Sequence, residues 1–258
     1  MGVSFDVMSY LLDFRRAAAE AGFLCEVLEE VSGYDIPAYT KISEGSPRVY
    51  LSSGMHGDEP AGVLAMRELL DCGCFDDRIE WRICPVVNPT GLALGTRENA
   101  QGVDLNRDYL RKTTKEVSAH VNWLEKQPVP EMFISLHEDW ESTGFYLYEI
   151  QKRGCPSTAE AILNAAAKEI PTEPSLLIDD HKVREPGWIF HEPRADYPEQ
   201  WPEAIYMAEM GTRVSYTLET PSSLSLEKRV ACHRLAVRTA VEEFLLTRGE
   251  AKGCNDGV

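Results

Sequence analysis

Residues 48–70, RVYLSSGMHGDEPAGVLAMRELL, carry the pattern that predicts the fold of this chain. The run RVYLSSG (48–54) is typical of a buried strand, and a helical pattern follows over residues 59–71. Between them, Asp58 is suited to cap the helix, and Pro60 is tolerated in its first turn. Buried strands that alternate with helices in this way predict an α/β domain.

The rest of the chain repeats this alternation. Further strands are predicted at EWRICPVV (80–87), MFISL (132–136), GFYLYEI (144–150) and RVSYTL (213–218). Further helices are predicted at residues 6–21, 114–126, 157–169, 199–210 and 225–247. No Pro/Gly/Ser-rich linker divides the chain. We therefore expect one domain over residues 1–250 with a mostly parallel sheet, followed by a loose tail at 251–258.

Composition limits the partners of the protein. The 258 residues carry a formal net charge of −16, from 26 Lys+Arg against 42 Asp+Glu. Nucleic acids and anionic membranes would repel such a chain, so neither is an expected partner. The seven cysteines form no CxxC pair, and the first residues do not resemble a signal peptide or a membrane span. We expect reduced thiols and a cytoplasmic location.

Polar side chains follow four of the predicted strands. His56 comes after RVYLSSG, Asn88 after EWRICPVV, His137 after MFISL, and Glu219 after RVSYTL. In open α/β sheets, binding crevices form at the carboxyl ends of the strands. Four such groups at one edge are difficult to attribute to chance, and they predict a functional site there.

The segment GMHGDEPAG (54–62) offers two metal ligands three positions apart, His56 and Glu59. A catalytic zinc takes three protein ligands and keeps a position open for water. His137 is the best-placed third ligand. HxxE alone favours the alternative of a hydrogen-bonded surface turn, because the pattern often occurs by accident.

The segment GVDLNRDY (102–109) places an acid, an amide and a guanidinium within four positions. Asp104 is suited to accept the second N–H of His56, as carboxylates do for metal-bound histidines. Arg107 is a rigid fork that matches a carboxylate, and Asn106 adds neutral hydrogen-bonding capacity. An Asx-type turn with a surface arginine is an equally good interpretation of this segment alone.

In SYTLETPSS (215–223), Glu219 ends a predicted buried strand and precedes a proline turn. Beside a zinc-bound water, such a carboxylate can accept a proton as the nucleophile forms. A glutamate near a turn, without a catalytic role, is the alternative.

The order of these motifs resembles the zinc metallocarboxypeptidase family. The motifs are HGDE at 56–59, NPTG at 88–91, Arg97, DLNR at 104–107, His137 and the glutamate of LETP at 219. The resemblance covers about residues 48 to 222 and is closest to the short bacterial branch that includes murein-peptide amidases. It implies a central mixed, mainly parallel sheet flanked by helices.

The resemblance also implies a role for each metal-site residue. His56, Glu59 and His137 would hold one zinc ion per chain, and Asp104 would orient His56. Glu219 would activate the water and pass its proton to the leaving amine.

The same resemblance implies how a substrate is held. Arg97 would polarise the scissile carbonyl and stabilise the oxyanion, and Asn106 and Arg107 would grip a free carboxylate. Digestive carboxypeptidases also close a tyrosine over the substrate, and Tyr197 and Tyr206 are both candidates for that position.

The predicted activity is zinc-dependent cleavage of an amide bond next to a free carboxylate in small peptides, including cell-wall peptides. One alternative is an N-acyl-amino-acid deacylase similar to succinylglutamate desuccinylase and aspartoacylase, which share the HxxE, DxNR, His and Glu pattern. The other is a non-catalytic binding module on a peptidase fold. The sequence does not indicate an oligomeric state.

Two further groups of polar residues are expected to lie in ordinary loops. His181 and His191 flank a stretch that contains proline and glycine, and we expect both to be loop histidines without a metal. Glu138, Asp139 and Glu141 are expected in a solvated loop.

Overall fold

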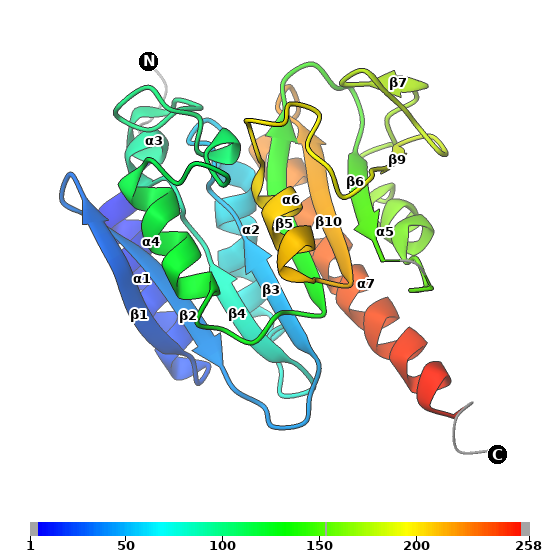
Figure 1. Ribbon diagram of the computed structural model, residues 1–258, viewed down its shortest axis with the longest axis horizontal. Helices are drawn as coiled ribbons and strands as arrows, with labels where there is room; N and C mark the ends of the chain where they lie inside the picture. The colour runs from blue at the N-terminus through cyan, green and yellow to red at the C-terminus, as the bar shows by residue number, and fades with distance from the viewer. Residues whose placement is uncertain (1–4, 153, 254–258) are drawn as a thin grey trace.

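An eight-stranded sheet forms the centre of the protein, as a computed structural model of residues 5–152 and 154–253 shows (Figure 1). The strands follow the order β1-β2-β4-β3-β5-β10-β6-β9. Their bounds are β1 Leu24–Val31, β2 Tyr34–Lys41, β3 Arg48–Ser52, β4 Glu80–Cys84, β5 Met132–Asp139, β6 Tyr146–Gln151, β9 Trp188–Phe190 and β10 Val214–Pro221. A separate two-stranded ribbon is made of β7 (Leu177–Ile178) and β8 (His181–Lys182).

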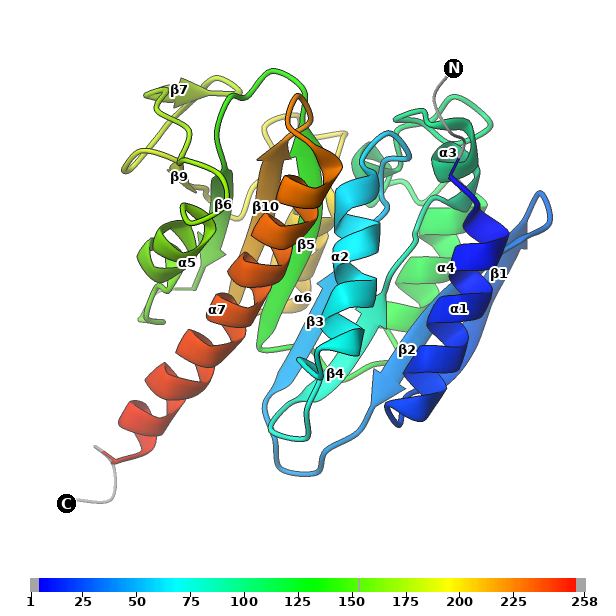
Figure 2. The ribbon, with the colours of Figure 1, turned by 180° about the vertical axis from the view of Figure 1, so that it is seen from behind.

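Helices cover both faces of the sheet (Figures 1 and 2). Their bounds are α1 Val7–Glu20, α2 Pro60–Asp71, α3 Pro89–Leu94, α4 Lys115–Leu124, α5 Ala159–Ala166, α6 Glu203–Met210 and α7 Leu226–Gly253, with a 3-10 turn at Leu105–Arg107. In Figure 2, α1, α2 and α7 lie over the face nearest the viewer, whereas α4 and α6 lie on the opposite face. The predicted α/β class is confirmed.

The sheet is mixed, as predicted. The central strands β4, β3, β5 and β10 pair in parallel with one another, and β6 pairs in parallel with β9. Antiparallel pairs join β1 to β2, β2 to β4, and β6 to β10. The parallel centre directs the carboxyl ends of four strands to one edge, where parallel sheets bind their ligands.

Several elements were not predicted. The β1–β2 hairpin lies at an edge of the sheet. Strand β1 is mostly exposed and carries the charged side chains of Glu26, Glu29 and Glu30. Its sequence therefore has no apolar run of the kind that marks a buried strand. The helix α3 has only six residues, too few for helical periodicity to be visible.

Two predicted strand ends differ from the structure. His137 and Glu219 were expected just after their strands, but β5 continues to Asp139 and β10 to Pro221. The two side chains therefore belong to paired residues of adjacent parallel strands, because Glu219 lies opposite His137 in the register. The parallel hydrogen-bond ladder continues past the apolar runs from which the strands were predicted.

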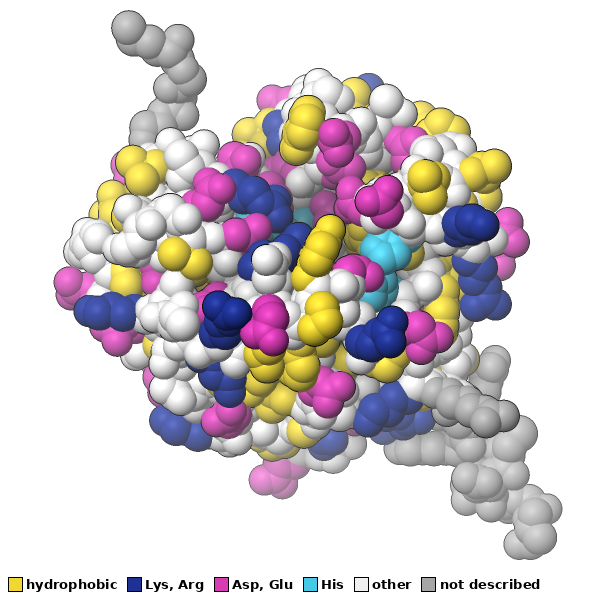
Figure 3. Space-filling view, turned by 45° about the horizontal axis from the view of Figure 1, so that its top comes forward, with side chains coloured by type: hydrophobic (Ala, Val, Ile, Leu, Met, Phe, Trp, Pro, Cys, Tyr) yellow, Lys and Arg dark blue, Asp and Glu magenta, His cyan; other side chains and the backbone are white. Residues whose placement is uncertain are grey.

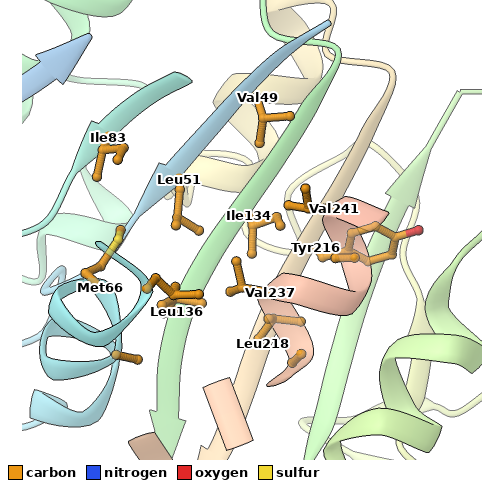
Figure 4. Close-up of a cluster of buried hydrophobic side chains, with 14 of the residues drawn as sticks. Val49, Leu51, Met66, Ile83, Ile134, Leu136, Tyr216, Leu218, Val237 and Val241 are labelled. Carbon is orange, nitrogen blue, oxygen red and sulfur yellow. The ribbon is translucent and has the colours of Figure 1, made fainter. Parts of the chain in front are cut away.

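Apolar packing fixes which face of the central strands points toward the site. Leu51, Ile134 and Leu218 are buried against Met66 of α2 and Val237 of α7 (Figure 4). Successive side chains of a strand point to opposite faces. Residues an odd number of positions away from these apolar ones, including His137 and Glu219, therefore point to the face that carries α6.

The start of α2 differs from the prediction. Glu59, not Asp58, is the N-cap residue, and its side chain makes no capping hydrogen bond. Glu138 supplies the missing acceptor, because its carboxylate accepts the N–H of Ala61 at 2.7 Å. The same carboxylate forms an ion pair with Arg229 of α7.

The prediction that Glu138 lies in a solvated loop is therefore wrong. Its side chain is fully buried in β5, where Arg229 provides the compensating charge, whereas Asp139 is half-buried and Glu141 is exposed. Through this ion pair and the hydrogen bond from Ala61, the carboxylate of Glu138 joins the strand that carries His137 to the helices α7 and α2.

The predictions for the C-terminal tail, the cysteines and membrane spans can be compared with the structure. The helix α7 reaches Gly253, and residues 254–258 of the predicted tail lie outside the described residues. The cysteines of the described segments are free thiols: Cys25, Cys72, Cys74, Cys84, Cys155 and Cys232. Within residues 5–152 and 154–253, every helix is too short or too polar to cross a bilayer. The cytoplasmic location stays a prediction.

The buried ion pair gives a prediction for stability. Replacing Glu138 by Ala leaves Arg229 without its partner and the Ala61 N–H without its acceptor, so the free energy of unfolding should fall by about 3–5 kcal/mol. Urea unfolding followed by circular dichroism measures this loss. Burial raises the pKa of Glu138 to about 7, so the comparison belongs at pH 8, where the carboxylate is ionised.

Glu141→Ala is the matched control, because Glu141 is acidic, close in sequence and exposed. It should change the free energy of unfolding by no more than about 0.5 kcal/mol. Equal losses in the two variants would contradict a structural role for Glu138.

Candidate active site

Three predicted metal ligands from separate parts of the chain converge at the carboxyl edge of the sheet. His56 lies in the turn after β3, Glu59 is the N-cap residue of α2, and His137 lies in β5. Nδ1 of His56 is 2.6 Å from Oε1 of Glu59, and Nδ1 of His137 is 2.9 Å from Oε2 of the same carboxylate. One ligand atom from each residue lies within 4.8 Å of the other two, and all three side chains are buried.

Glycine shapes the turn that carries His56. A Cβ atom at Gly57 would lie 1.8 Å from the carbonyl carbon of Gly91 in α3, so only glycine allows this contact of two backbones. Asn88, the N-cap of α3, accepts the N–H of Gly91 at 2.8 Å. Asn88 therefore stabilises the start of α3, against which this turn packs. It does not line the pocket, although it was predicted to lie with His56 at the carboxyl edge of the sheet.

The proton positions at His56 show that this cluster favours a cation. Nε2 of His56 is 3.2 Å from Oδ1 of Asp104, and a carboxylate only accepts, so Nε2 carries a hydrogen. In the neutral ring, the lone pair of Nδ1 then faces the carboxylate of Glu59. Burial opposes a charge on His56, but Glu59 and Asp104 outweigh it and raise its pKa to about 9.

The donor set fits zinc. Two imidazole nitrogens and one carboxylate within bonding reach of a common centre are the ligands of many catalytic zinc sites. Burial keeps the pKa of His137 below its ordinary value, so this imidazole is neutral and able to ligate. Burial also opposes the charge of Glu59, yet the two histidines hold its pKa well below the usual range.

Arg97 and Asp104 lie beside this cluster. Nε of Arg97 donates to Oδ2 of Asp104 at 3.0 Å, and Nη1 of Arg97 is 3.5 Å from Oε1 of Glu59. Asp104 therefore contacts His56 and Arg97 at once. Burial acts against its charge, but the hydrogen bond from His56 and the nearby cations keep its pKa below the ordinary range.

Asn106 and Arg107 continue the same loop into the pocket. Oδ1 of Asn106 accepts the backbone N–H of Glu203 at 2.9 Å, so its amide NH₂ remains as a donor group. Nη1 of Arg107 donates to the carbonyl oxygen of Asn106 at 2.8 Å. Among the described residues, no carboxylate lies within salt-bridge distance of Arg107, so its charge is available to a ligand.

Glu219 lies next to His137 in the register of β5 and β10. Burial, and after it the charge of Glu59, raises the pKa of Glu219 well above its ordinary value. A half-buried carboxyl group beside a metal-ligand cluster has the position of a general base.

A single pocket of about 640 Å³ contains most of the predicted site. It is lined by His56, Glu59, Arg97, Asn106, Arg107, His137 and Glu219. Figure 3 shows the hollow on this side of the molecule, with acidic, basic and histidine side chains gathered around it. The volume is in the range of pockets that hold small-molecule ligands.

The structure separates the two candidate tyrosines. Tyr197 lines the pocket and is 65% exposed. Tyr206 is buried in α6, and its hydroxyl donates to Glu125 at 3.0 Å. Only Tyr197 of these two is placed to contact a substrate.

Other pocket residues were missed at the sequence level. Ser135 and Thr217 each precede a predicted site residue by two positions, so strand alternation alone places them on the face of His137 and Glu219. Glu203 has no such signal, because an acid in the first turn of a helix is ordinary.

Glu203 ends a buried chain of hydrogen bonds. Its carboxylate accepts from the hydroxyls of Tyr50 at 2.9 Å and Ser52 at 2.7 Å, and burial raises its pKa to about 7. The single hydroxyl hydrogen of Tyr50 goes to Glu203, so the Tyr50 oxygen accepts a hydrogen bond from Nε2 of His120. The other ring nitrogen of His120, Nδ1, then accepts from the hydroxyl of Tyr109. This chain fixes the floor of the pocket.

A search of protein families matches residues 45–166 to the model described as the Succinylglutamate desuccinylase/Aspartoacylase catalytic domain. The matched segment contains the metal-ligand candidates, Arg97 and the 104–107 motif, and it ends before Glu219. A carboxypeptidase of Arabidopsis thaliana is 26% identical over 120 residues, which cover 40% of this chain and 24% of that protein.

Solved structures resemble the whole chain. A candidate metallopeptidase of Shewanella amazonensis has a TM-score of 0.83 at 23% identity, and the match covers 93% of each chain. This chain has a carboxypeptidase-like fold. A metallo-carboxypeptidase of Burkholderia cenocepacia has a TM-score of 0.65 at 18% identity, over 92% of this chain and 68% of that one. The predicted resemblance to carboxypeptidases and to the related desuccinylase/aspartoacylase group is confirmed.

The proton on His56 gives a prediction for metal binding. With a pKa of about 9, His56 is charged in the metal-free protein at pH 7, and it must become neutral to ligate. Zinc binding at this site should therefore release about one proton at pH 7, and the affinity should rise with pH until about 9. Calorimetry in two buffers with different ionisation enthalpies measures the release.

Asp104→Asn is the control for this linkage. It removes a partner that raises the pKa of His56, so the proton release should disappear at a lower pH than in the wild type. A pH profile of proton release that does not move in this variant would assign the proton to another group.

Proposed function

We propose that the protein is a zinc-dependent hydrolase of the metallocarboxypeptidase type. It would cleave an amide bond next to a free carboxylate in small peptides, including cell-wall peptides. One observation carries the proposal: the carboxyl group of Glu219 lies beside the His56–Glu59–His137 cluster, in a pocket that also presents Arg97 and Arg107.

His56, Glu59 and His137 would hold one zinc ion at this site. When bound, zinc supplies a Lewis acid and lowers the pKa of a water molecule to about 7. Asp104 keeps the hydrogen of His56 on Nε2, so Nδ1 points its lone pair into the ligand cluster.

Glu219 acts as the base and then as the acid. It accepts a proton from the attacking water and gives it to the leaving amine, so amide and water become a carboxylic acid and an amine. Burial raises the pKa of Glu219, which favours the protonated form that the second step requires.

The two arginines of the pocket bind different parts of the substrate. Arg97, oriented by Asp104, meets the negative charge that develops on the scissile carbonyl oxygen. Arg107, with the free amide of Asn106, binds the terminal carboxylate of the substrate. Tyr197, on the exposed rim, is the candidate to close over it.

A deacylase of N-acyl amino acids is the second candidate, because the matched family model has that description. Its substrates also carry an amide next to a free carboxylate. A panel of dipeptides, N-acetyl and N-succinyl amino acids separates the two activities. Zinc-loaded protein that turns over no compound of a wider panel would favour a non-catalytic binding module.

The base assignment gives a prediction for catalysis. Glu219→Gln keeps the shape of the side chain and removes the proton acceptor, so zinc content should not change. The value of kcat should fall by a factor of about 10² to 10⁴. Turnover of the best substrate from the panel, with zinc content measured on the same samples, checks this.

Glu141→Gln is the matched control, since Glu141 is acidic and lines the same pocket from its exposed rim. Its kcat should stay close to that of the wild type. If Glu219→Gln is as active as this control, another group is the base.

The carboxylate grip gives a prediction for specificity. Arg107→Ala should raise the KM for substrates with a free carboxylate about ten- to a hundredfold, because a charge-assisted contact is lost. Amidation of that carboxylate should impair the wild type and matter little to the variant.

Arg111 is an exposed arginine outside the pocket. Its replacement by Ala should change neither the KM for substrates with a free carboxylate nor the effect of amidation. Equal turnover of free and amidated substrates by the wild type would rule out recognition of the terminal carboxylate.

A further inference from the structure

A second cluster of metal-ligating side chains lies on the wall of the same pocket. His181 comes from β8, and His191 and Asp196 come from the segment after β9. One ligand atom from each of the three residues lies within 4.8 Å of the other two. All three residues line the pocket that contains His56, Glu59 and His137.

The proton positions in this cluster leave a lone pair facing a carboxylate. Nδ1 of His191 is 2.6 Å from the carbonyl oxygen of Glu192, which only accepts, so Nδ1 carries the hydrogen. Nε2 of His191 then lies 3.3 and 3.4 Å from the two oxygens of Asp196. A metal ion between these atoms would remove the repulsion between the lone pair of His191 and the carboxylate of Asp196.

This arrangement repeats the one at His56. There, Asp104 fixes the hydrogen on one ring nitrogen, and the other nitrogen faces a carboxylate. Fixing one ring nitrogen by a backbone carbonyl or a carboxylate is how proteins orient metal-bound imidazoles.

Ring contacts hold the second cluster in place. The rings of His181 and His191 meet edge to face with centroids 4.9 Å apart, and Nε2 of His181 is 3.4 Å from Asp196. The ring of Tyr148 makes a T-shaped contact with each of the two histidine rings. Its hydroxyl donates to Asp179 at 2.7 Å. The side chain of Asp196 remains 55% exposed, so an ion can reach the cluster from the solvent.

We propose that His181, His191 and Asp196 form a second metal site, for Zn²⁺ or another divalent transition ion. Two imidazoles and one carboxylate suit such ions and leave a coordination position for water or a substrate group. The sequence favoured ordinary loop histidines because His181 and His191 are ten positions apart in a stretch without a strong pattern. The fold brings them together.

The second ion joins the β7–β8 ribbon to the segment that leads to Tyr197. It closes the chain from His181 to Asp196 into a loop at the rim of the pocket. A metal that closes a loop restricts its motion. The second site therefore orders one wall of the substrate pocket, and it does so whether or not the proposed hydrolase activity is correct.

Metal content of the full chain tests the proposal. Metal-free protein is incubated with excess ZnCl₂, desalted, and analysed by mass spectrometry of the metal. The wild type should hold about two zinc ions per chain, and the His181→Ala/His191→Ala variant about one. The zinc that this variant retains also shows that it is folded.

Two further variants complete the comparison. His56→Ala/His137→Ala should keep the second ion and lose the first. Glu192→Gln is the matched control, because its exposed side chain neighbours His191 while the ring contacts the backbone carbonyl instead; it should hold about two ions. Asp196→Asn should lower occupancy of the second site.

Limited proteolysis gives a readout that does not depend on turnover. Zinc should protect residues 171–202 in the wild type and in His56→Ala/His137→Ala, but not in His181→Ala/His191→Ala. One zinc ion in the wild type without this protection would overturn the proposal. Two ions in His181→Ala/His191→Ala would overturn it as well. A wild type that holds two ions without hydrolysing any substrate contradicts the proposed function alone.

Discussion

The carboxylate of Glu138 connects three elements whose relative position determines the site. It lies in β5 next to His137, accepts a backbone N–H at the start of α2, and pairs with Arg229 of α7. Because Glu138 satisfies the helix terminus, Glu59 need not cap its own helix and can turn its carboxylate toward the two histidines. The geometry of the metal-ligand cluster thus depends on the carboxylate of Glu138, which is not itself one of the predicted ligands.

Much of the fold and of the candidate site was predictable because it follows from local pattern. Apolar runs marked the central strands, and the polar residues at their ends marked the edge where His56, His137 and Glu219 meet. The β1–β2 hairpin was not predictable in this way, since an exposed edge strand with several glutamates has no apolar run.

Other features depend on contacts between distant parts of the chain. The burial of Glu138 requires Arg229, which lies 91 positions later in the sequence. The convergence of His181 and His191 depends on how a stretch with little regular structure folds against Tyr148. Residues of these types are usually exposed, so composition alone favours a solvated interpretation in both cases.

The Glu138–Arg229 pair has a consequence for how related chains diverge. In a descendant that keeps the architecture but abandons turnover, Glu219 can change at little cost to the fold, because its proposed role is catalytic. Such a descendant cannot replace Glu138 without also changing Arg229 and the start of α2. Comparing Glu219 with the Glu138–Arg229 pair in related chains would therefore distinguish inherited shape from inherited chemistry.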